Sequence, residues 1–484
     1  VIVMSSVSEP FGITALEAAA HNCAAIITKQ SGAGEVIING FKYDYWDEDR
    51  LADILINLAS SSALTSHLKA NALEEIRGSN RMKSVVLYLH VHQPYRIAPY
   101  SVFKAGYDHD YFADHNNPNV SAQNETKHKK VASKSYLPTN TLLQELLEKY
   151  PDFRLSLSIT GTFIEQCEAW APEVLESFKR LIATGRVEVV GETYHHSLAF
   201  FYSRPEFERQ VQMHRDKVKE LFGVTPLTFR NTELAYYDEI GAWADQAGYM
   251  AVLAEGWDPI LGWRSPNYVY RPPQTKNIKL LLKNYRLSDD IAFRFSNRDW
   301  NEWPLTVDKY MSWLPVEDEQ IINLFMDYET FGEHQWDDSG IFEFMRTFVD
   351  KISTTEWYGF KTITEAATLP AKDVVSMPYT VTWADTERDL SAWLGNAMQQ
   401  EAMRYLYELE DVVIDSGDQQ LIDDWRKLQT SDHAYYMCTK YFRDGDVHAY
   451  FSPYTSPYNA FLYYMNVIRD MRWRILELHK DGTE

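Results

Sequence analysis

One unit recurs along the middle of this chain and constrains its fold more than any other feature: an apolar stretch that ends in polar residues and is followed by a helical stretch. The predicted strands cover residues 84–91, 153–159, 187–190, 227–229, 250–253 and 321–326, and predicted helices cover 139–149, 172–183, 205–222 and 238–247. This alternation is typical of a parallel α/β sheet. Polar side chains follow the strand ends, at His92, Glu192, His196, Glu233, Glu255 and Asp327. In a barrel of parallel strands these ends form the active-site face, so we expect a barrel with its site there.

Residues 321–335, IINLFMDYETFGEHQ, show this feature most clearly. An apolar strand is followed by Asp327, Glu329, Glu333 and His334, and Gly332 predicts a loop after the strand. Crowded carboxylates repel one another, and with partial burial this raises the pKa of at least one of them, as a general acid requires. A calcium site or a helix-capping cluster is the alternative from these residues alone. A partner acid at the end of another strand favours catalysis.

The first strand of this series ends in two histidines. Alternation places His90 and His92 on one face, and Pro94 ends the strand. The sequence supports two interpretations of this pair about equally, a structural role and a place in a functional site. The next stretch, residues 109–135, is polar and lacks periodicity, and we expect a long surface loop over the site.

Composition narrows the classes of partner and compartment. The chain has 484 residues, enough for two or three domains, and no apolar run long enough to cross a membrane, which predicts a soluble protein. A net charge of −22 argues against nucleic acid or an anionic membrane as partner. The aromatic content of 14% fits either a densely packed core or stacking on sugars. Cys23, Cys167 and Cys438 are far apart and fit a reducing compartment rather than a disulfide framework or a zinc site. Together with the absence of a signal sequence, this predicts a cytoplasmic protein.

The first eighty residues form a separate pattern of strand, turn and helix. The sequence EPFGITALEA contains Glu9 and Glu17, which on their own read equally well as a solvated helix face. It resembles the nucleotide-sugar motif of glycosyltransferase family 4, which implies that Glu9 lies near the transferred sugar and Glu17 reaches the ribose. The resemblance covers only the tail of such an enzyme. We therefore expect residues 1–79 to be a partial, Rossmann-like α/β fragment without activity, joined by a linker at residues 77–82, with Met82 as the start of what was once a separate protein.

The rest of the chain resembles glycoside hydrolase family 57. The matching motifs are HVHQP at 90–94, GETYHH at 191–196, FRNTELAY at 229–236, MDYETFGEH at 326–334 and, less closely, WADTERDLSAWLGN at 383–396. The resemblance implies an incomplete (β/α)7 TIM-like barrel, assigned to residues 80–380, and a helical C-terminal domain, assigned to residues 381–484. It also implies a retaining mechanism with Glu233 as nucleophile and Asp327 as acid/base. Tyr328 stands where family members often have Gly or Ala, which points to a subgroup.

Further residues are assigned to substrate binding. The resemblance places His92 and His196 there, although His195 beside His196 leaves that position open. The other candidates are Arg230, Trp257, Glu329, His334, Trp383, Asp389 and Trp393, the two later tryptophans reading equally well as core. Arg230 is expected to keep Glu233 ionised, and Glu329 to raise the pKa of Asp327 as a like-charge neighbour.

These patterns predict an amylase-like, retaining hydrolase of α-glucans or maltooligosaccharides that needs no metal and no cofactor. A 4-α-glucanotransferase would use the same catalytic pair. A non-catalytic glucan-binding protein or an active glycosyltransferase is less favoured, the first because the acid pair is intact and the second because the transferase motif lacks its acceptor domain. The sequence leaves the oligomeric state open.

Overall fold

The computed structural model describes residues 1–6, 13–21, 23–31, 40–61, 64–66, 68–69, 83–315, 319–440 and 451–481. The chain divides into two compact units, an N-terminal unit of residues 1–83 and a larger unit of residues 84–315 and 319–484.

The N-terminal unit contains a parallel sheet in the order β1 (Ile2–Met4), β2 (Ala25–Thr28) and β3 (Phe41–Tyr43), with helices α1 (Ile13–Ala20) and α3 (Glu48–Ser60). The side chain of Asp47 caps α3 by accepting a hydrogen bond from the backbone N–H of Arg50 at 3.0 Å. On the apolar face of α3, Ile54 and Leu58 pack in one cluster with strand residues. The predicted parallel α/β layer is confirmed. Glu17 is exposed on α1, whereas Glu9 lies outside the described residues.

Seven parallel strands form the barrel of the larger unit, among the residues that the structure describes. They are β4 (Lys83–Val91), β5 (Leu155–Ile159), β6 (Val187–Val189), β7 (Thr228–Phe229), β8 (Ala251–Glu255), β10 (Lys279–Lys283) and β11 (Ile321–Asp327). Ladders join β11-β4-β5-β6 and β7-β8-β10. A parallel bridge between Gly191 and Phe229 links the two sheets at one junction. At the other, the N–H of Asn284 donates to the carbonyl of Asn323 at 2.9 Å. Thus the barrel is incomplete rather than fully laddered.

Short strands extend the two sheets: β12 (Tyr358–Phe360) pairs with β4, and β9 (Tyr270–Arg271) joins β10 to β13 (Asp373–Val374). Helices surround the barrel: α6 (Leu137–Lys149), α7 (Gly161–Trp170), α8 (Pro172–Ala183), α9 (Arg204–Phe222), α10 (Asp238–Gln246) and α14 (Ile341–Thr354). Inside it, Val86, Tyr88, Leu253 and Phe325 form a buried cluster that fills the space below the site. The six predicted strands and the four predicted barrel helices are confirmed; α7, α14 and β10 were not predicted.

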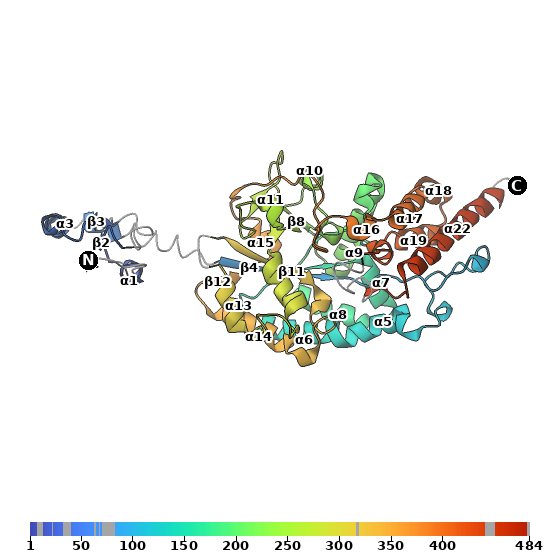
Figure 1. The fold of residues 1–484 in the computed structure, drawn as a ribbon, viewed down its shortest axis with the longest axis horizontal. Coiled ribbons are helices and arrows are strands. Elements are labelled where there is room, and N and C mark those ends of the chain that lie inside the picture. Colours follow the sequence, from blue (N-terminus) through green and yellow to red (C-terminus); the bar gives the residue numbers. More distant parts are fainter. Residues whose placement is uncertain are drawn as a thin grey trace. The chain divides into compact units, whose positions relative to one another are not determined.

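The C-terminal part of the chain is helical, as expected, but two of the three long helices expected there, over residues 389–409 and 419–436, are each divided into shorter ones. The stretch expected to be continuous from residue 389 to 409 divides into α16 (Ser391–Leu394) and α17 (Ala397–Tyr407), because Asn396 begins a new helix with a capping box to Gln399. Next come α18 (Glu410–Ser416), α19 (Gln419–Lys427), α20 (Ser431–Tyr435) and the long α22 (Pro457–Asp481). In Figure 1 these orange to red helices gather at one end of the larger unit.

The prediction of a long surface loop over residues 109–135 is wrong. Much of this stretch is helical, with α5 (Asn124–Val131) followed by the π-helical η4 (Ala132–Tyr136). Asn124, His128 and Val131 are the buried residues of α5, spaced as one helix face. Asn124 donates from its amide to the carbonyls of Arg96 and Phe112. The helix was missed because its buried face is mostly polar, so it shows no hydrophobic period.

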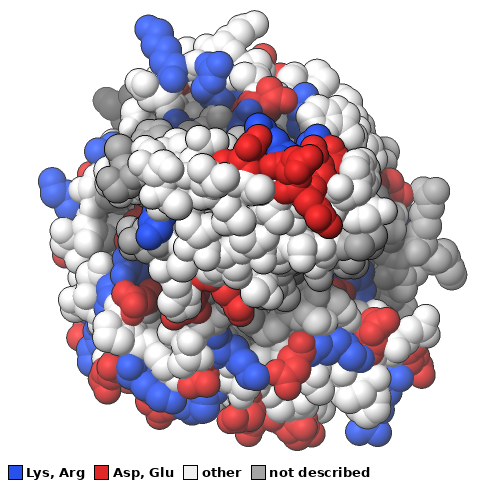
Figure 2. All heavy atoms as spheres, turned by 90° about the vertical axis from the view of Figure 1, so that its left-hand side faces the viewer, with Lys and Arg blue, Asp and Glu red and all other residues white. Residues whose placement is uncertain are grey.

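On the face drawn in Figure 2, Lys and Arg side chains are interspersed with Asp and Glu side chains, and some acidic groups stand together. Among the described residues, no helix combines the length and apolar character that a membrane span requires.

Candidate active site

A cavity of about 400 Å³ opens at the C-terminal ends of the barrel strands. Asp327 ends β11, Lys283 ends β10, and His92 follows β4. Of the residues predicted for the site, His92, His196, Glu233, Asp327, Glu329, His334, Trp383 and Trp393 line this cavity. The strand ends therefore bring together side chains that are far apart in sequence, as a barrel requires.

Glu233 is held by donors from three parts of the chain. Its Oε1 accepts hydrogen bonds from Ser431 Oγ at 2.8 Å and from His196 Nε2 at 3.1 Å, and its Oε2 accepts one from Trp383 Nε1 at 2.9 Å. The backbone at Glu233 is left-handed, with φ of 60°. Non-glycine residues rarely adopt this conformation, and such strain gathers at functional sites. Here it also occurs at His196, Leu234, Asp385 and Arg388.

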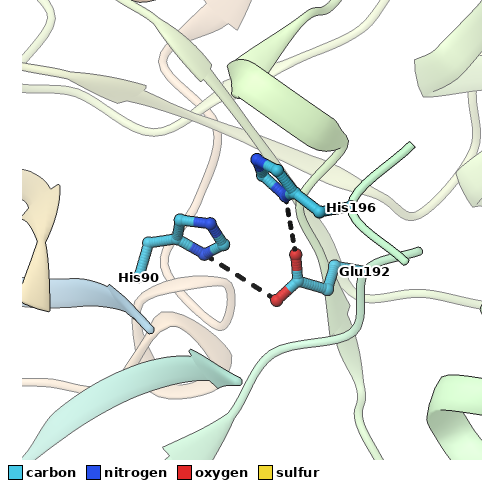
Figure 3. A group of neighbouring side chains, drawn as sticks. All are labelled: His90, Glu192 and His196. Carbon is cyan, nitrogen blue, oxygen red and sulfur yellow. Dashed lines mark hydrogen bonds and ion pairs between the residues drawn. The ribbon is translucent and has the colours of Figure 1, made fainter. Parts of the chain in front are cut away.

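His196 connects Glu233 to a buried carboxylate. Its Nδ1 lies 3.5 Å from Oε2 of Glu192, and Oε1 of Glu192 lies 3.8 Å from Nδ1 of His90, so the carboxylate stands between two imidazoles (Figure 3). Burial opposes a charge on His196, but the hydrogen bonds to Glu192 and Glu233 raise its pKa to about 9. The ring is therefore an imidazolium at neutral pH. Burial alone would favour neutral Glu233, yet the bond to His196 and its charge lower the pKa of Glu233. Arg230 acts in the same direction, as expected, with a smaller contribution.

The pKa of Asp327 is shifted in the opposite direction from that of Glu233. Burial, and next the neighbouring charge of Glu233, raise its pKa to about 6. The expected repulsion between Asp327 and Glu329 is present, but it raises the pKa of Glu329, whereas Glu233 is the neighbouring carboxylate that raises the pKa of Asp327. Burial and then the charge of Asp327 raise the pKa of Glu329 to about 8. Glu329 also accepts a hydrogen bond of 2.5 Å from the hydroxyl of Tyr136 in the π-helix η4. The cavity thus holds an ionised glutamate and an aspartic acid poised near neutrality.

The segment that carries Trp383 is fastened to the barrel by Arg388. The guanidinium of Arg388 donates to Glu255 Oε2 at 3.0 Å and to Asp289 Oδ2 at 3.1 Å, and it also donates to the carbonyl of Trp383. Lys283 donates to Asp289 at 2.9 Å from the end of β10. Since these groups are buried, removing one partner leaves an uncompensated charge.

Sequence reasoning missed two residues of helix α20. Ser431 binds Glu233, and Oδ2 of Asp432 lies 3.0 Å from Nε2 of His92. The N–H of Ser431 donates to the carbonyl of His196 at 2.9 Å, which holds the start of α20 on the barrel. In the sequence, Ser431, Asp432 and His433 look like an ordinary helix start, and no motif or residue spacing marks them as part of a site.

Three candidates lie outside the cavity lining. Arg230 is fully buried behind the site, with its guanidinium carbon 4.8 Å from the ring centroid of Trp383. Trp257 packs against an apolar cluster beside the barrel, and the exposed Asp389 accepts the N–H of Ser391 at 2.8 Å. The structure therefore does not bring Trp257 or Asp389 to this cavity. His196 lines it, whereas the adjacent buried His195 does not.

Among the residues described, two overlapping groups have the geometry to hold a metal ion: His90 with Glu192 and His196, and His92 with His196 and Asp432. Arg230 places a permanent positive charge 3.9 Å from Glu192, which disfavours a cation in the first group. In the second group the ligand atoms of His92 and Asp432 already bind each other. The expectation that catalysis needs no metal stays a prediction.

Comparison with known proteins gives two family matches. A model described as glycosyl hydrolase family 57 matches residues 86–378, and one described as glycosyl transferases group 1 matches residues 1–75. A Methanocaldococcus jannaschii protein provisionally named an alpha-amylase is 44% identical over 361 residues, covering 72% of this chain and 77% of that protein. An alpha-amylase of Pyrococcus horikoshii is 23% identical over 231 residues, 47% of this chain, and the chain spans only 35% of its length.

A solved structure also shares the fold. The family 57 branching enzyme of Thermococcus kodakaraensis superposes with a TM-score of 0.56 at 13% identity, covering 73% of this chain and 86% of that one. At this identity the likeness concerns the fold alone, and it confirms the expected incomplete barrel followed by helices.

Proposed function

This chain belongs to glycosyl hydrolase family 57, and we propose that it is a retaining hydrolase that cleaves α-1,4-glucans such as starch, glycogen and maltooligosaccharides. The observation that carries the proposal is that Glu233 and Asp327 line one cavity while their pKa values are shifted in opposite directions. A glycosidase needs this division, with one carboxyl ionised and the other able to donate a proton.

In the first step, a carboxylate oxygen of Glu233 attacks the anomeric carbon while Asp327 gives its proton to the glycosidic oxygen. The bond from the anomeric carbon to that oxygen breaks, and the shortened glucan leaves as an alcohol. Glu233 is ready for this step because His196, Ser431 and Trp383 fix both of its oxygens. Fixed donors of this kind hold the nucleophile in place at no cost during the reaction.

In the second step, Asp327, now ionised, takes a proton from water, and the water oxygen attacks the anomeric carbon of the glycosyl enzyme. Glu233 is released, and two inversions give net retention. Two-step retention requires the carboxyl groups to lie about 5–6 Å apart. That separation stays a prediction of this proposal.

A 4-α-glucanotransferase is the second candidate, because it would use the same pair and pass the glycosyl group to a sugar hydroxyl in place of water. The wide lining of the cavity, with aromatic side chains from Trp383, Trp393, Tyr435 and Phe451, would serve an acceptor sugar equally well. A glucan-binding protein without activity has less support, since binding alone does not require the opposite pKa shifts.

Incubation with maltoheptaose tests the proposal. Hydrolysis yields shorter oligosaccharides whose new reducing ends are first released as the α-anomer in the proton NMR spectrum. A ladder of longer oligosaccharides would assign transferase activity instead. Glu233→Gln serves as the inactive control, and the absence of any product from the folded native chain would contradict both readings.

We also place the functional boundaries near residues 80 and 380, with a catalytic barrel between them and a helical domain after them. Residues 1–79 we interpret as a transferase remnant, supported by the match to the glycosyl transferase family over residues 1–75. The substrate is a neutral sugar polymer, which suits a chain of net charge −22 better than an anionic ligand would.

A further inference from the structure

A second cavity, of about 720 Å³, lies beside the active site in the larger unit. The segment of residues 332–336 borders both spaces. Glu333 and His334 line the active-site cavity, whereas Gly332 and Trp336 line the second one. The mechanism described above uses no residue of this second cavity.

The position of this segment depends on Gly332. Its φ is 101°, and a Cβ atom there would lie 2.0 Å from the backbone carbonyl oxygen of Lys134, so only glycine lets the segment approach the π-helix η4 this closely. The approach places the ammonium of Lys134 5.1 Å from the ring centroid of Trp336. The contact that positions the loop after β11 therefore also brings Lys134 and Trp336 together in the lining of the second cavity.

Trp336 gives the cavity a flat aromatic wall. The side chain is 57% exposed, although burial is the usual state of so large an apolar group. Polar side chains surround it: Lys134, Asp337 and Asp338 are exposed in the lining, and Arg346 donates to Glu145 at 2.8 Å at the rim. A flat ring bordered by planar carboxylates and a guanidinium suits a pyranose, whose C–H face stacks on the ring while its hydroxyls reach the polar groups.

We propose that this cavity is a second binding site for the α-glucan chain, separate from the catalytic cavity, with Trp336 as its stacking platform. The proposal rests on the proposed function, since it takes the same polymer as ligand. The two cavities share residues 332–336 as a common border, with Glu333 and His334 on one side and Gly332 and Trp336 on the other. This favours a long glucan as occupant, because one polymer chain can contact both sides of the segment. A short oligosaccharide would occupy the catalytic cavity alone.

The test compares Trp336→Ala with Trp357→Ala in the full chain. Trp357 is a matched control because it is 62% exposed and lines neither cavity. Binding of amylose is measured by calorimetry in the Glu233→Gln background, so that cleavage does not interfere. Trp336→Ala is expected to weaken amylose binding about fivefold to tenfold, the loss of one stacking contact. Trp336→Tyr, which keeps a flat ring, should restore most of the affinity.

Kinetics separate the second site from the first. With Glu233 intact, Trp336→Ala should raise KM for amylose and leave kcat/KM for maltotriose within about twofold of the native value, since a trisaccharide does not span both cavities. Two results would overturn the second site while leaving the hydrolase proposal intact. One is that Trp336→Ala lowers kcat/KM equally for amylose and maltotriose. The other is that Trp336→Ala binds amylose as tightly as Trp357→Ala does. A native chain that cleaves neither substrate would overturn both.

Discussion

The indole Nε1 of Trp383 donates a hydrogen bond of 2.9 Å to Oε2 of Glu233, although 150 positions separate the two residues. The backbone N–H of Trp383 also donates to the carbonyl of Glu233, at 3.3 Å. The segment after the barrel therefore fixes both the side chain and the main chain of the proposed nucleophile. Substitutions in this segment should therefore change the rate of the reaction as well as the stability of the chain.

Replacing Glu233 with Ala should abolish formation of the glycosyl enzyme and lower kcat on maltoheptaose by at least about 10⁴-fold. Added azide should restore turnover and give a product of inverted configuration, identified by NMR. Glu239→Ala, which removes an exposed partner of Arg204, is the matched control and should leave activity unchanged. A rescued product of retained configuration would contradict the assignment of Glu233.

Replacing Asp327 with Ala should cost about 10²-fold to 10⁴-fold on maltooligosaccharides, the usual contribution of a general acid. The loss should be far smaller for the glycosylation step on an aryl glycoside with a good leaving group, because that group departs without a proton. Azide should here give a product of retained configuration. If Asp327→Ala lowers the rate equally on maltooligosaccharides and on the aryl glycoside, the proton donor should be sought at Glu329.

The pH profile of kcat/KM should be bell-shaped. Asp327 must be protonated to act as the acid, so activity is present below its pKa of about 6 and falls as the pH rises above it. Glu233 must be ionised, and because its pKa is lowered, the acidic limb lies below the ordinary glutamate value. The charge of His196 lowers the pKa of both carboxyls. His196→Gln should therefore move both limbs to higher pH, and unmoved limbs would contradict this electrostatic role.

Replacing Arg388 with Met should lower kcat about tenfold to 100-fold and destabilise the chain by about 3–5 kcal/mol, because it leaves Glu255 and Asp289 buried near one cation fewer. Thermal melting and steady-state kinetics measure the two effects. Arg388→Lys should recover part of each. Arg404→Met is the control, since that exposed arginine pairs with Glu408 one helical turn away. Loss of stability with unchanged kcat would limit Arg388 to a structural role.

A chain that begins at Met82 should cleave maltoheptaose with unchanged kcat and KM. The expectation follows from our interpretation of residues 1–79 as a remnant, since the proposed catalytic groups all come from residues beyond 90. Circular dichroism checks that the shortened chain is folded. A folded chain that has lost activity would show that the first residues take part in function.

Strand periodicity predicted the parts of the site that stand at strand ends. Alternation placed His90 and His92 on one face, and their rings lie 5.8 Å apart in stacked planes. The same logic predicted that Glu233 and Asp327 stand at strand ends, since Asp327 ends β11 and Glu233 follows β7. Their catalytic roles were predicted from the family resemblance. These positions depend on local sequence together with one rule of barrel topology, and both are visible in the chain.

Other parts depend on tertiary contacts that leave no local signal. Strand β10 has lysine at both ends, and Lys283 is tolerated there because Asp289 and Glu255 surround it. Ser431 reaches Glu233 across 198 positions. No period or spacing in the sequence connects such pairs, because the connection is made by the packing of the C-terminal helices on the barrel.

The pairing of the first and last barrel strands has a consequence for the chain while it is being synthesised. β4 and β11 pair in parallel with His90 opposite Asp327, and His92 meets Asp432 across 340 positions. Contacts this distant in sequence form slowly, and these two can form only after Asp327 and Asp432, respectively, have been made. A nascent chain that ends before α20 lacks Ser431 and Asp432, so Glu233 and His92 gain these two partners only once the C-terminal helices have been made.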